Sequence, residues 1–249
     1  MYNVDTYQIN HCNVFTIKPK YKTSKGHILY LHGGAFVSSF INFHWSFLGD
    51  IIDKTDCTIT APDYPLAPTY TYKDVLQMVT ALYKKLLSTV GSENLIISGD
   101  SAGGGIALAL AQKLKVENIA QPNHIILLSP WLDLTLSNPE ISKIGPADPF
   151  IGIKGLQLAA NAYAGGDDLN NYLLSPINGS LDGLGKISVF VGTKEILVAD
   201  TRKLKKLMEA KGVQIDYHEY KDMFHAWMFL SFPESRQAKV EIEQLINSS

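Results

Sequence analysis

The sequence has 249 residues, of which 46% are hydrophobic and 18% are charged. These fractions are typical of a folded globular protein and exclude a disordered chain. The formal net charge of −2 gives no reason to expect a nucleic acid or a membrane surface as partner. One domain over 1–249 is the simplest interpretation of this length, although two small domains would also fit.

The N-terminus is not expected to be a signal peptide. Residues 1–5 contain no basic region followed by an apolar one, which a signal peptide requires. No apolar run in the sequence approaches the length of a membrane span. The sequence therefore predicts a protein that is located in the cytoplasm.

Apolar runs alternate with amphipathic segments along most of the chain. The pattern predicts strands over 7–9, 12–17, 27–31, 57–61, 95–97, 125–128, 187–191 and 214–219. It predicts helices over 46–54, 73–87, 106–111, 154–163, 199–211 and 234–246. Strands that are apolar throughout indicate an α/β fold, a mostly parallel central sheet with helices on both faces. In such sheets, functional sites lie beyond the carboxyl ends of the strands.

A serine stands between two glycines where a predicted strand gives way to a helix. The apolar run over 95–97 leads to Gly99, Ser101 and Gly103, and a small-residue run over 106–111 follows. Glycine two residues away on either side lets a serine occupy a sharp, strained turn without clashes. Such a turn exposes the hydroxyl beside a helix N-terminus, which favours negative charge. Ser101 is therefore a candidate nucleophile; the alternative is a glycine-rich turn that packs a helix on the sheet.

A serine hydroxyl needs a base, and seven histidines could supply it. His225 lies in the loop after the last predicted strand, between Phe224 and Ala226. One known triad order along a chain is nucleophile, acid, base, with the base after the last strand. His225 is therefore the candidate base, and the alternative is a packed loop histidine. His32 opens a glycine turn and is expected to hold it, whereas His44 could line a pocket.

The acid that orients the base has three candidates. Glu195 follows the strand before the strand of the histidine, where the chain order requires an acid. Asp200 lies at the start of the next predicted helix, where helix capping is the alternative role. Asp133 follows the strand after the serine turn, a less common position for the acid. We expect Glu195, and because Glu exceeds Asp by one methylene, its loop should lie slightly further back.

An oxyanion hole requires backbone N–H groups that point at one place. Ala102, directly after the candidate nucleophile, is one expected donor. His32, Gly33 and Gly34 end an earlier strand, and glycines let the backbone approach a substrate closely. We therefore expect the N–H groups of Gly33 and Gly34 as further donors; the alternative is a turn that only joins strand to helix.

These motifs follow one another in an order that resembles a known family. The blocks are His-Gly-Gly-Ala-Phe at 32–36, Asp-Tyr-Pro-Leu-Ala-Pro at 63–68, Gly-Asp-Ser-Ala-Gly-Gly at 99–104, Ser-Pro-Trp-Leu-Asp at 129–133, Asp-Pro-Phe at 148–150, Leu-Ser-Pro at 174–176, Gly-Thr-Lys-Glu at 192–195 and Phe-His-Ala at 224–226. Together they resemble the hormone-sensitive lipase-like branch of the α/β-hydrolases, which contains many bacterial carboxylesterases. The resemblance runs from about His27 to the end of the chain and implies an α/β-hydrolase fold with a small cap.

Three positions depart from the pattern of this family. Ala35 stands where a third glycine is usual, which is tolerable if Ala35 packs rather than donates. Thr69 replaces a common acidic residue, and Glu195 stands where Asp is usual. The N-terminal segment is too short for a full cap domain, so 1–26 and the insertion 137–185 are expected to form a reduced lid over a more open site.

The resemblance implies a serine carboxylic-ester hydrolase that works through an acyl-enzyme, with Ser101, His225 and Glu195 as its triad and no metal or organic cofactor. A reduced lid favours small or short-acyl esters. The alternatives are a serine peptidase or amidase of the same fold, and a non-catalytic binding protein on a hydrolase scaffold; a homodimer is left open. The side chains that could wall the substrate pocket are Phe36, His44, Trp45, Trp131, Phe150 and Trp227.

Overall fold

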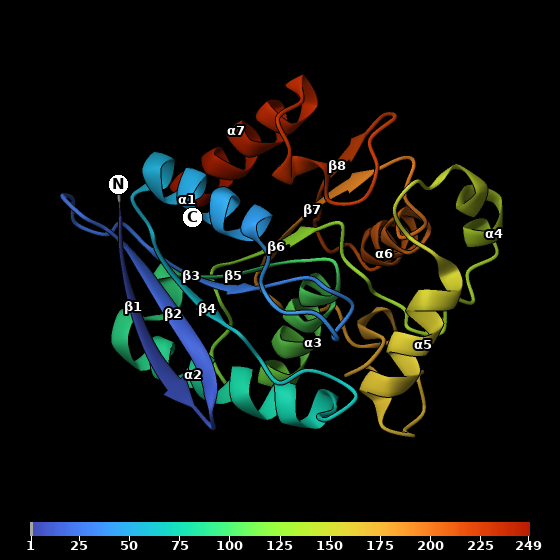
Figure 1. Ribbon diagram of the computed structural model, residues 1–249, viewed down its shortest axis with the longest axis horizontal. Helices are drawn as coiled ribbons and strands as arrows, with labels where there is room; N and C mark the ends of the chain where they lie inside the picture. The colour runs from blue at the N-terminus through green and yellow to red at the C-terminus, as the bar shows by residue number, and fades with distance from the viewer. Residues whose placement is uncertain (1) are drawn as a thin grey trace.

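The computed structural model describes residues 2–249, which build one sheet of eight strands (Figure 1). The strands are β1 Tyr2–Ile9, β2 Cys12–Pro19, β3 His27–Leu31, β4 Thr58–Pro62, β5 Leu95–Asp100, β6 His124–Leu128, β7 Lys186–Gly192 and β8 Asp216–Tyr220. Their order across the sheet is β1-β2-β4-β3-β5-β6-β7-β8. Strands β3 to β8 run parallel, and the β1–β2 hairpin joins β4 in the antiparallel direction. The predicted mostly parallel sheet is confirmed.

Helices cover both faces of the sheet, as predicted. They are α1 Asn42–Thr55, α2 Tyr72–Val90, α3 Ala102–Val116, α4 Glu140–Ile144, α5 Ile153–Ala164, α6 Val198–Ala210 and α7 Pro233–Asn247. Helices α1 and α7 pack on one face, and α2, α3 and α6 pack on the other. Helices α4 and α5 lie together beside one end of the sheet (Figure 1). None of the helices described in residues 2–249 is long and apolar enough to cross a membrane.

The central strands feed two hydrophobic cores by alternating their side chains. In β3, Leu29 and Leu31 belong to the core beneath α2 and α3, whereas Ile28 and Tyr30 belong to the core beneath α1 and α7. Every residue of β3 is therefore buried, which explains the unbroken apolar run in the sequence. Each such side chain stabilises the fold by about 1.5–3 kcal/mol when fully buried. The strands thus form a rigid base for the loops that follow them.

The predicted strands and helices are all present, with bounds that shift by a few residues. β1 and β2 are longer than predicted because Asn10 and His11, with φ of 49° and 66°, close a two-residue hairpin. Helix α1 begins earlier because Nδ1 of His44 accepts the N–H of Ile41 (3.1 Å), a capping role that the pattern does not announce. β8 begins later, at Asp216, and the short helix α4 was not predicted.

The two segments expected to form a lid differ in what they do. Residues 2–19 form the β1–β2 hairpin, which extends the sheet by pairing with β4. None of the described residues 2–26 lines the cavity beside Ser101, so a lid role expected for this segment is not seen there. The insertion 137–185 carries α4 and α5, and residues 150–156 of it do line that cavity.

Four loops that carry the motifs meet at one end of the sheet. Gly33 follows β3, Ser101 follows β5, Glu195 follows β7, and His225 follows β8. Because these strands are parallel, their carboxyl ends share one edge, and the loops after them converge. Helices α4 and α5 lie beside this edge (Figure 1). The fold therefore assembles a site from residues that are distant in the sequence.

Candidate active site

Ser101 is the only residue between β5 and α3, and its backbone is strained. It has φ of 52° and ψ of −121°, a conformation that L side chains rarely adopt. Two hydrogen bonds to neighbouring segments hold it there: its N–H donates to the carbonyl of Leu128 (2.9 Å), and its own carbonyl accepts the N–H of Trp131 (2.9 Å). The turn therefore presents the hydroxyl in a fixed direction above the sheet.

The two glycines flanking Ser101 have no room for a side chain. A Cβ at Gly99 would lie 2.5 Å from the carbonyl oxygen of Gly103. A Cβ at Gly103 would lie 2.0 Å from the carbonyl oxygen of Leu31. The glycine spacing in the sequence thus reflects close packing between the turn, α3 and β3.

His225 and Glu195 extend a line of hydrogen bonds away from Ser101. Nε2 of His225 lies 2.9 Å from Oγ of Ser101, and Nδ1 lies 2.6 Å from Oε2 of Glu195. The other carboxylate oxygen of Glu195 accepts the hydroxyl of Ser129 (2.7 Å) and the N–H of Gly192 (2.8 Å). Glu195 is completely buried, so these bonds replace the water it has lost. Ser129 was not predicted from the sequence.

The surroundings of His225 favour its charged form. Burial lowers the pKa of His225, but the charge of Glu195 and its hydrogen bond act in the opposite direction. The charges of Asp100 and Asp148 add to that effect. The net result is a pKa above the usual histidine value. The imidazole can therefore accept a proton readily and hold it as a stabilised cation.

The alternative acids lie away from His225. Oδ1 of Asp200 accepts the side-chain amide of Asn138 (2.9 Å), and burial raises the pKa of Asp200 to about 6. Oδ1 of Asp133 accepts the N–H and the hydroxyl of Thr135 (2.9 and 2.6 Å). The structure brings Glu195 to the histidine, and gives Asp200 and Asp133 other partners.

The expected oxyanion donors need one correction. The N–H of Gly33 donates to Oδ1 of the buried Asp100 (2.8 Å), so it is not free to bind a substrate. Gly34 and Ala35, with φ of 118° and 52°, line the cavity instead. No acceptor within residues 2–249 takes the N–H of Gly34, Ala35 or Ala102. The side chain of Ala35 packs against the core, as expected, and its unpaired backbone N–H is a further candidate donor.

His32 and His44 lie close together beside this region, with ring centroids 6.0 Å apart. Nδ1 of the buried His32 donates to the carbonyl of Gly33 (2.6 Å), and its ring stacks on Tyr64 with centroids 4.2 Å apart. These contacts hold the glycine turn, as expected for His32. His44 lines the cavity, where its Nε2 lies 3.4 Å from Oδ2 of Asp100.

A cavity of about 510 Å³ opens over Ser101 and His225. Its walls are mainly apolar and come from three stretches, 34–44, 150–156 and 224–230. The apolar side chains among them are Ala35, Val37, Ile41, Phe43, Phe150, Ile151, Leu156, Phe224, Ala226, Phe229 and Leu230. No lysine or arginine is among its described lining residues. The cavity is therefore suited to a small uncharged molecule.

Of the six residues predicted to wall the pocket, His44 and Phe150 line this cavity and the other four do not. Phe36 is buried and stacks on Tyr163 with centroids 3.7 Å apart. Trp131 and Trp227 are fully buried, and Trp45 packs edge-on against Phe15 (4.9 Å). Large aromatic side chains near a sheet edge complete the core here, whereas mostly smaller residues flanking the motifs form the cavity walls. Phe36, Trp131 and Trp227 lie in or directly beside the motifs and are still buried, so proximity to a motif does not identify a wall residue either.

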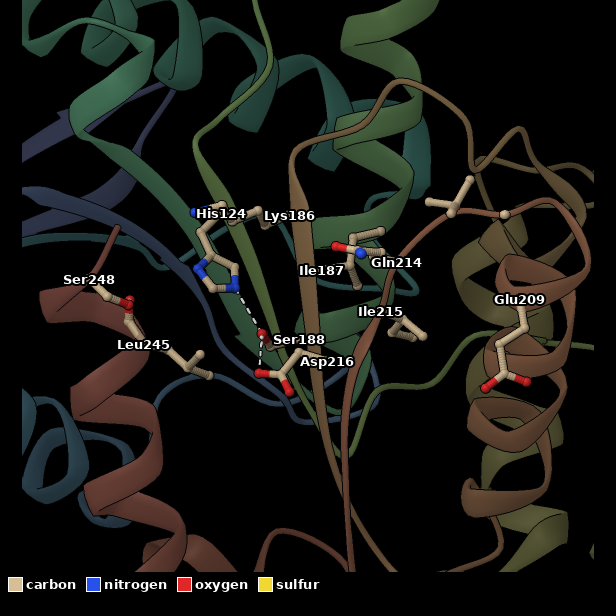
Figure 2. Close-up of a pocket in the computed structure, with 12 residues that line it drawn as sticks. His124, Lys186, Ile187, Ser188, Glu209, Gln214, Ile215, Asp216, Leu245 and Ser248 are labelled. Atoms are coloured by element: carbon tan, nitrogen blue, oxygen red, sulfur yellow. Dashed lines mark hydrogen bonds between the residues drawn. The ribbon is translucent and has the colours of Figure 1, made fainter.

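A second hollow, about 730 Å³, lies at the opposite end of the strands and also contains serine, histidine and aspartate (Figure 2). Oγ of Ser188 lies 2.8 Å from Nε2 of His124 and donates to Oδ2 of Asp216 (3.1 Å). The serine thus stands between histidine and acid, so the carboxylate cannot orient the imidazole. Ser188 is also fully buried within β7. This group does not have the arrangement of an activated nucleophile.

The site around Ser101 has N–H donors for an anion, but its described residues form no cluster of metal ligands. Within residues 2–249, no group of three or more His, Cys, Asp or Glu side chains is arranged to hold a metal ion. A hydroxyl, a base held by a buried acid and three free N–H groups together suit attack on a carbonyl group.

Known proteins with similar sequences and structures agree with this geometry. A family model described as alpha/beta hydrolase fold matches residues 28–229. The chain is 34% identical over 230 residues to an esterase of Acinetobacter venetianus, covering 89% of this chain and 74% of that one. It is 27% identical over 237 residues to an acetyl-hydrolase of Streptomyces hygroscopicus, covering 94% of this chain and 79% of that one.

The fold has a similar counterpart among solved structures. The crystal structure of an esterase from the bacterial hormone-sensitive lipase family has a TM-score of 0.93 and 28% sequence identity with this chain. The match covers 99% of this chain and 84% of that one. The resemblance predicted from the motifs is thereby confirmed. The chain belongs to the alpha/beta hydrolase fold family and is similar within it to hormone-sensitive lipase-like esterases.

Proposed function

We propose that this protein hydrolyses short-acyl carboxylic esters, with Ser101, His225 and Glu195 as its catalytic triad. The observation that carries the proposal is the line of contacts from Oγ of Ser101 to His225 (2.9 Å) and on to the buried Glu195 (2.6 Å). The similarity to proteins named esterase and acetyl-hydrolase supports an ester as the substrate. A cytoplasmic location and a homodimer remain predictions from the sequence.

The reaction would proceed in two halves. Oγ of Ser101 attacks the ester carbonyl carbon while Nε2 of His225 takes the hydroxyl proton. The oxyanion that forms accepts hydrogen bonds from the N–H groups of Gly34, Ala35 and Ala102. His225 then gives its proton to the departing alcohol, and the acyl group stays on Ser101. In the second half His225 deprotonates a water molecule, which attacks the acyl-enzyme and releases the carboxylic acid.

The cavity supports short, uncharged acyl and alcohol groups. Its volume of about 510 Å³ lies in the lower half of the range for ligand sites, and its described lining residues include no lysine or arginine that would bind a substrate carboxylate. Residues 150–156 wall one side, so the insertion 137–185 acts as a reduced lid beside the nucleophile. A lid of this size leaves the cavity accessible from solvent.

A panel of p-nitrophenyl esters tests the proposal. We expect hydrolysis of the acetate and butyrate with kcat/KM at least about tenfold above that of the dodecanoate, because one methylene in an apolar pocket changes discrimination by about 10-fold or more. Phenylmethylsulfonyl fluoride should label one tryptic peptide, the peptide that contains Ser101. Faster turnover of the dodecanoate, or turnover of anilides but not esters, would contradict the proposed substrate. No turnover of any ester would favour a binding protein.

Gly155 on α5 offers a separate test of the cavity. It lines the cavity, and a Cβ built on it meets nothing within 4 Å, so Gly155→Leu adds bulk without backbone strain. We expect kcat/KM for the butyrate ester to fall about tenfold or more relative to the acetate ester, because the added side chain shortens the space for the acyl group. Steady-state kinetics on both esters measure this ratio.

The matched control is Gln157→Leu on the same helix. Gln157 is exposed and lies away from the catalytic cavity. The Gln157→Leu variant should leave the ratio of kcat/KM for the acetate ester to that for the butyrate ester unchanged. Equal ratios for both variants would show that α5 does not limit the acyl group.

A further inference from the structure

We propose that Asp148 is a positioning residue, whose carboxylate ties the cavity wall to the loop that carries Glu195. The inference rests on the proposed triad. Oδ1 of Asp148 accepts the N–H groups of Phe150 (2.8 Å) and Ile151 (3.0 Å), and Oδ2 accepts the N–H of Ile196 (2.9 Å). One half-buried side chain therefore joins two segments that are 48 residues apart in the sequence.

The bond to Ile196 fixes the backbone directly after the acid. Ile196 is fully buried, so its N–H requires a partner within the protein. Asp148, which lies in the insertion 137–185, supplies that partner. The carboxylate of Glu195 is held separately, by Gly192 and Ser129. The acid is thus fixed through its side chain by the core and through its backbone by the insertion.

At the other end of this connection, the bonds from the N–H groups of Phe150 and Ile151 fix the cavity wall to Asp148. They close a tight turn that places Phe150 over Phe224, with ring centroids 5.1 Å apart and planes 1° from parallel. Phe224 directly precedes His225, and both aromatic rings line the cavity. Loss of Asp148 would therefore release a cavity wall and the acid loop together, which predicts changes in both KM and kcat.

The charge of Asp148 also reaches the histidine. The charged or titratable groups near His225 are Glu195 after β7, Asp100 at the end of β5, Asp148 in the insertion and His44 on α1. The negative charges of Asp148, Asp100 and Glu195 all raise the pKa of His225. Removing the charge of Asp148 should lower that pKa, so the acid limb of the pH–rate profile should move to lower pH.

Asp148→Asn tests the proposal because it keeps the shape and removes the charge and one acceptor. We expect kcat/KM on the acetate ester to fall by about 10- to 100-fold, since small misplacements of catalytic groups cost up to about that factor. The acid limb should move to lower pH, and Asp148→Glu, which restores the charge, should return it toward the wild-type position. Circular dichroism should show that all variants remain folded.

The matched control is Asp168→Asn. Asp168 makes the same kind of turn, accepting the N–H of Asn170 (2.9 Å), but it is exposed and remote from the cavity. It should leave kcat/KM and the acid limb unchanged. Wild-type values in Asp148→Asn, or a loss of activity without a shift of the limb, would overturn the inference.

Titration of the His225 imidazole by NMR separates this inference from the proposed function. If no ester is turned over, the proposed function fails, yet Asp148→Asn should still lower the imidazole pKa and Asp168→Asn should not. Faster hydrogen exchange at the Ile196 amide in Asp148→Asn would further support the connection. Unchanged imidazole titration and unchanged exchange at Ile196 would reject it.

Discussion

Replacing Ser101 with alanine is expected to lower kcat for p-nitrophenyl acetate by about 10⁴-fold or more, with little change in KM. The hydroxyl is the group that forms the acyl-enzyme, and nucleophile deletions in serine hydrolases cost on the order of 10⁴- to 10⁶-fold. The free N–H groups of Gly34, Ala35 and Ala102 remain in the variant, so a small residual rate above the uncatalysed reaction should persist. Steady-state kinetics with freshly purified variant protein measure the loss.

Ser188→Ala provides a matched control for that experiment. Ser188 is buried and, like Ser101, lies within hydrogen-bond distance of a histidine, His124 (2.8 Å). It lies at the other end of the strands, outside the cavity over Ser101. Its kcat should stay within about threefold of wild type, because it touches none of the reacting atoms. A Ser101→Ala variant that is as active as wild type would disprove the nucleophile assignment.

The positions of Ser101, Glu195 and His225 could be predicted because they depend on features that the sequence encodes locally. Ser101 is marked by glycines that steric contact requires, since a Cβ at Gly99 or Gly103 would collide with backbone oxygens. Glu195 follows the apolar strand β7 and His225 follows the more polar edge strand β8, and parallel strands bring such loops to one edge. The hydrophobic period of the predicted strands and the spacing of the motif residues are therefore enough to place these groups near one another.

The loop over 33–35 shows that a local sequence pattern cannot decide which backbone N–H groups are unpaired. Gly33 and Gly34 look alike in the sequence, but the N–H of Gly33 is taken by Asp100, which is 67 residues further along the chain. Which peptide faces the cavity depends on that distant carboxylate. Ala35 adopts φ of 52° although it carries a Cβ, so its residue type alone did not mark it as a candidate donor.

The cavity walls were the hardest part to predict, for a related reason. Side-chain direction in irregular loops is set by tertiary packing, and residue type is a poor guide to it. Phe36 turns into the core against Tyr163, whereas Phe150, two-thirds exposed, lines the cavity. Ser129 and Asp148 were missed as partners of the acid and its loop because each makes its contact across a long separation in sequence.

Glu195→Gln is expected to lower kcat by about 10³- to 10⁴-fold while leaving KM nearly unchanged. A neutral amide cannot stabilise the imidazolium or enforce the required tautomer of His225, and equivalent changes in other triads cost about 10⁴-fold. The pH profile should move as well. The carboxylate raises the pKa of His225, so its removal lowers that pKa. Because only the neutral imidazole acts as a base, the acid limb should shift to lower pH.

Asp200→Asn distinguishes this assignment from the other candidate acid. Asp200 is buried and its pKa is raised to about 6 by burial, so it titrates in the same pH range as a histidine. It bonds to Asn138 and not to His225, and its loss should therefore leave kcat within about threefold of wild type and the acid limb in place. The reverse pattern, an inactive Asp200→Asn variant beside an active Glu195→Gln variant, would assign the acid to Asp200. That pattern would require α6 to move, since the line from Ser101 through His225 ends at Glu195.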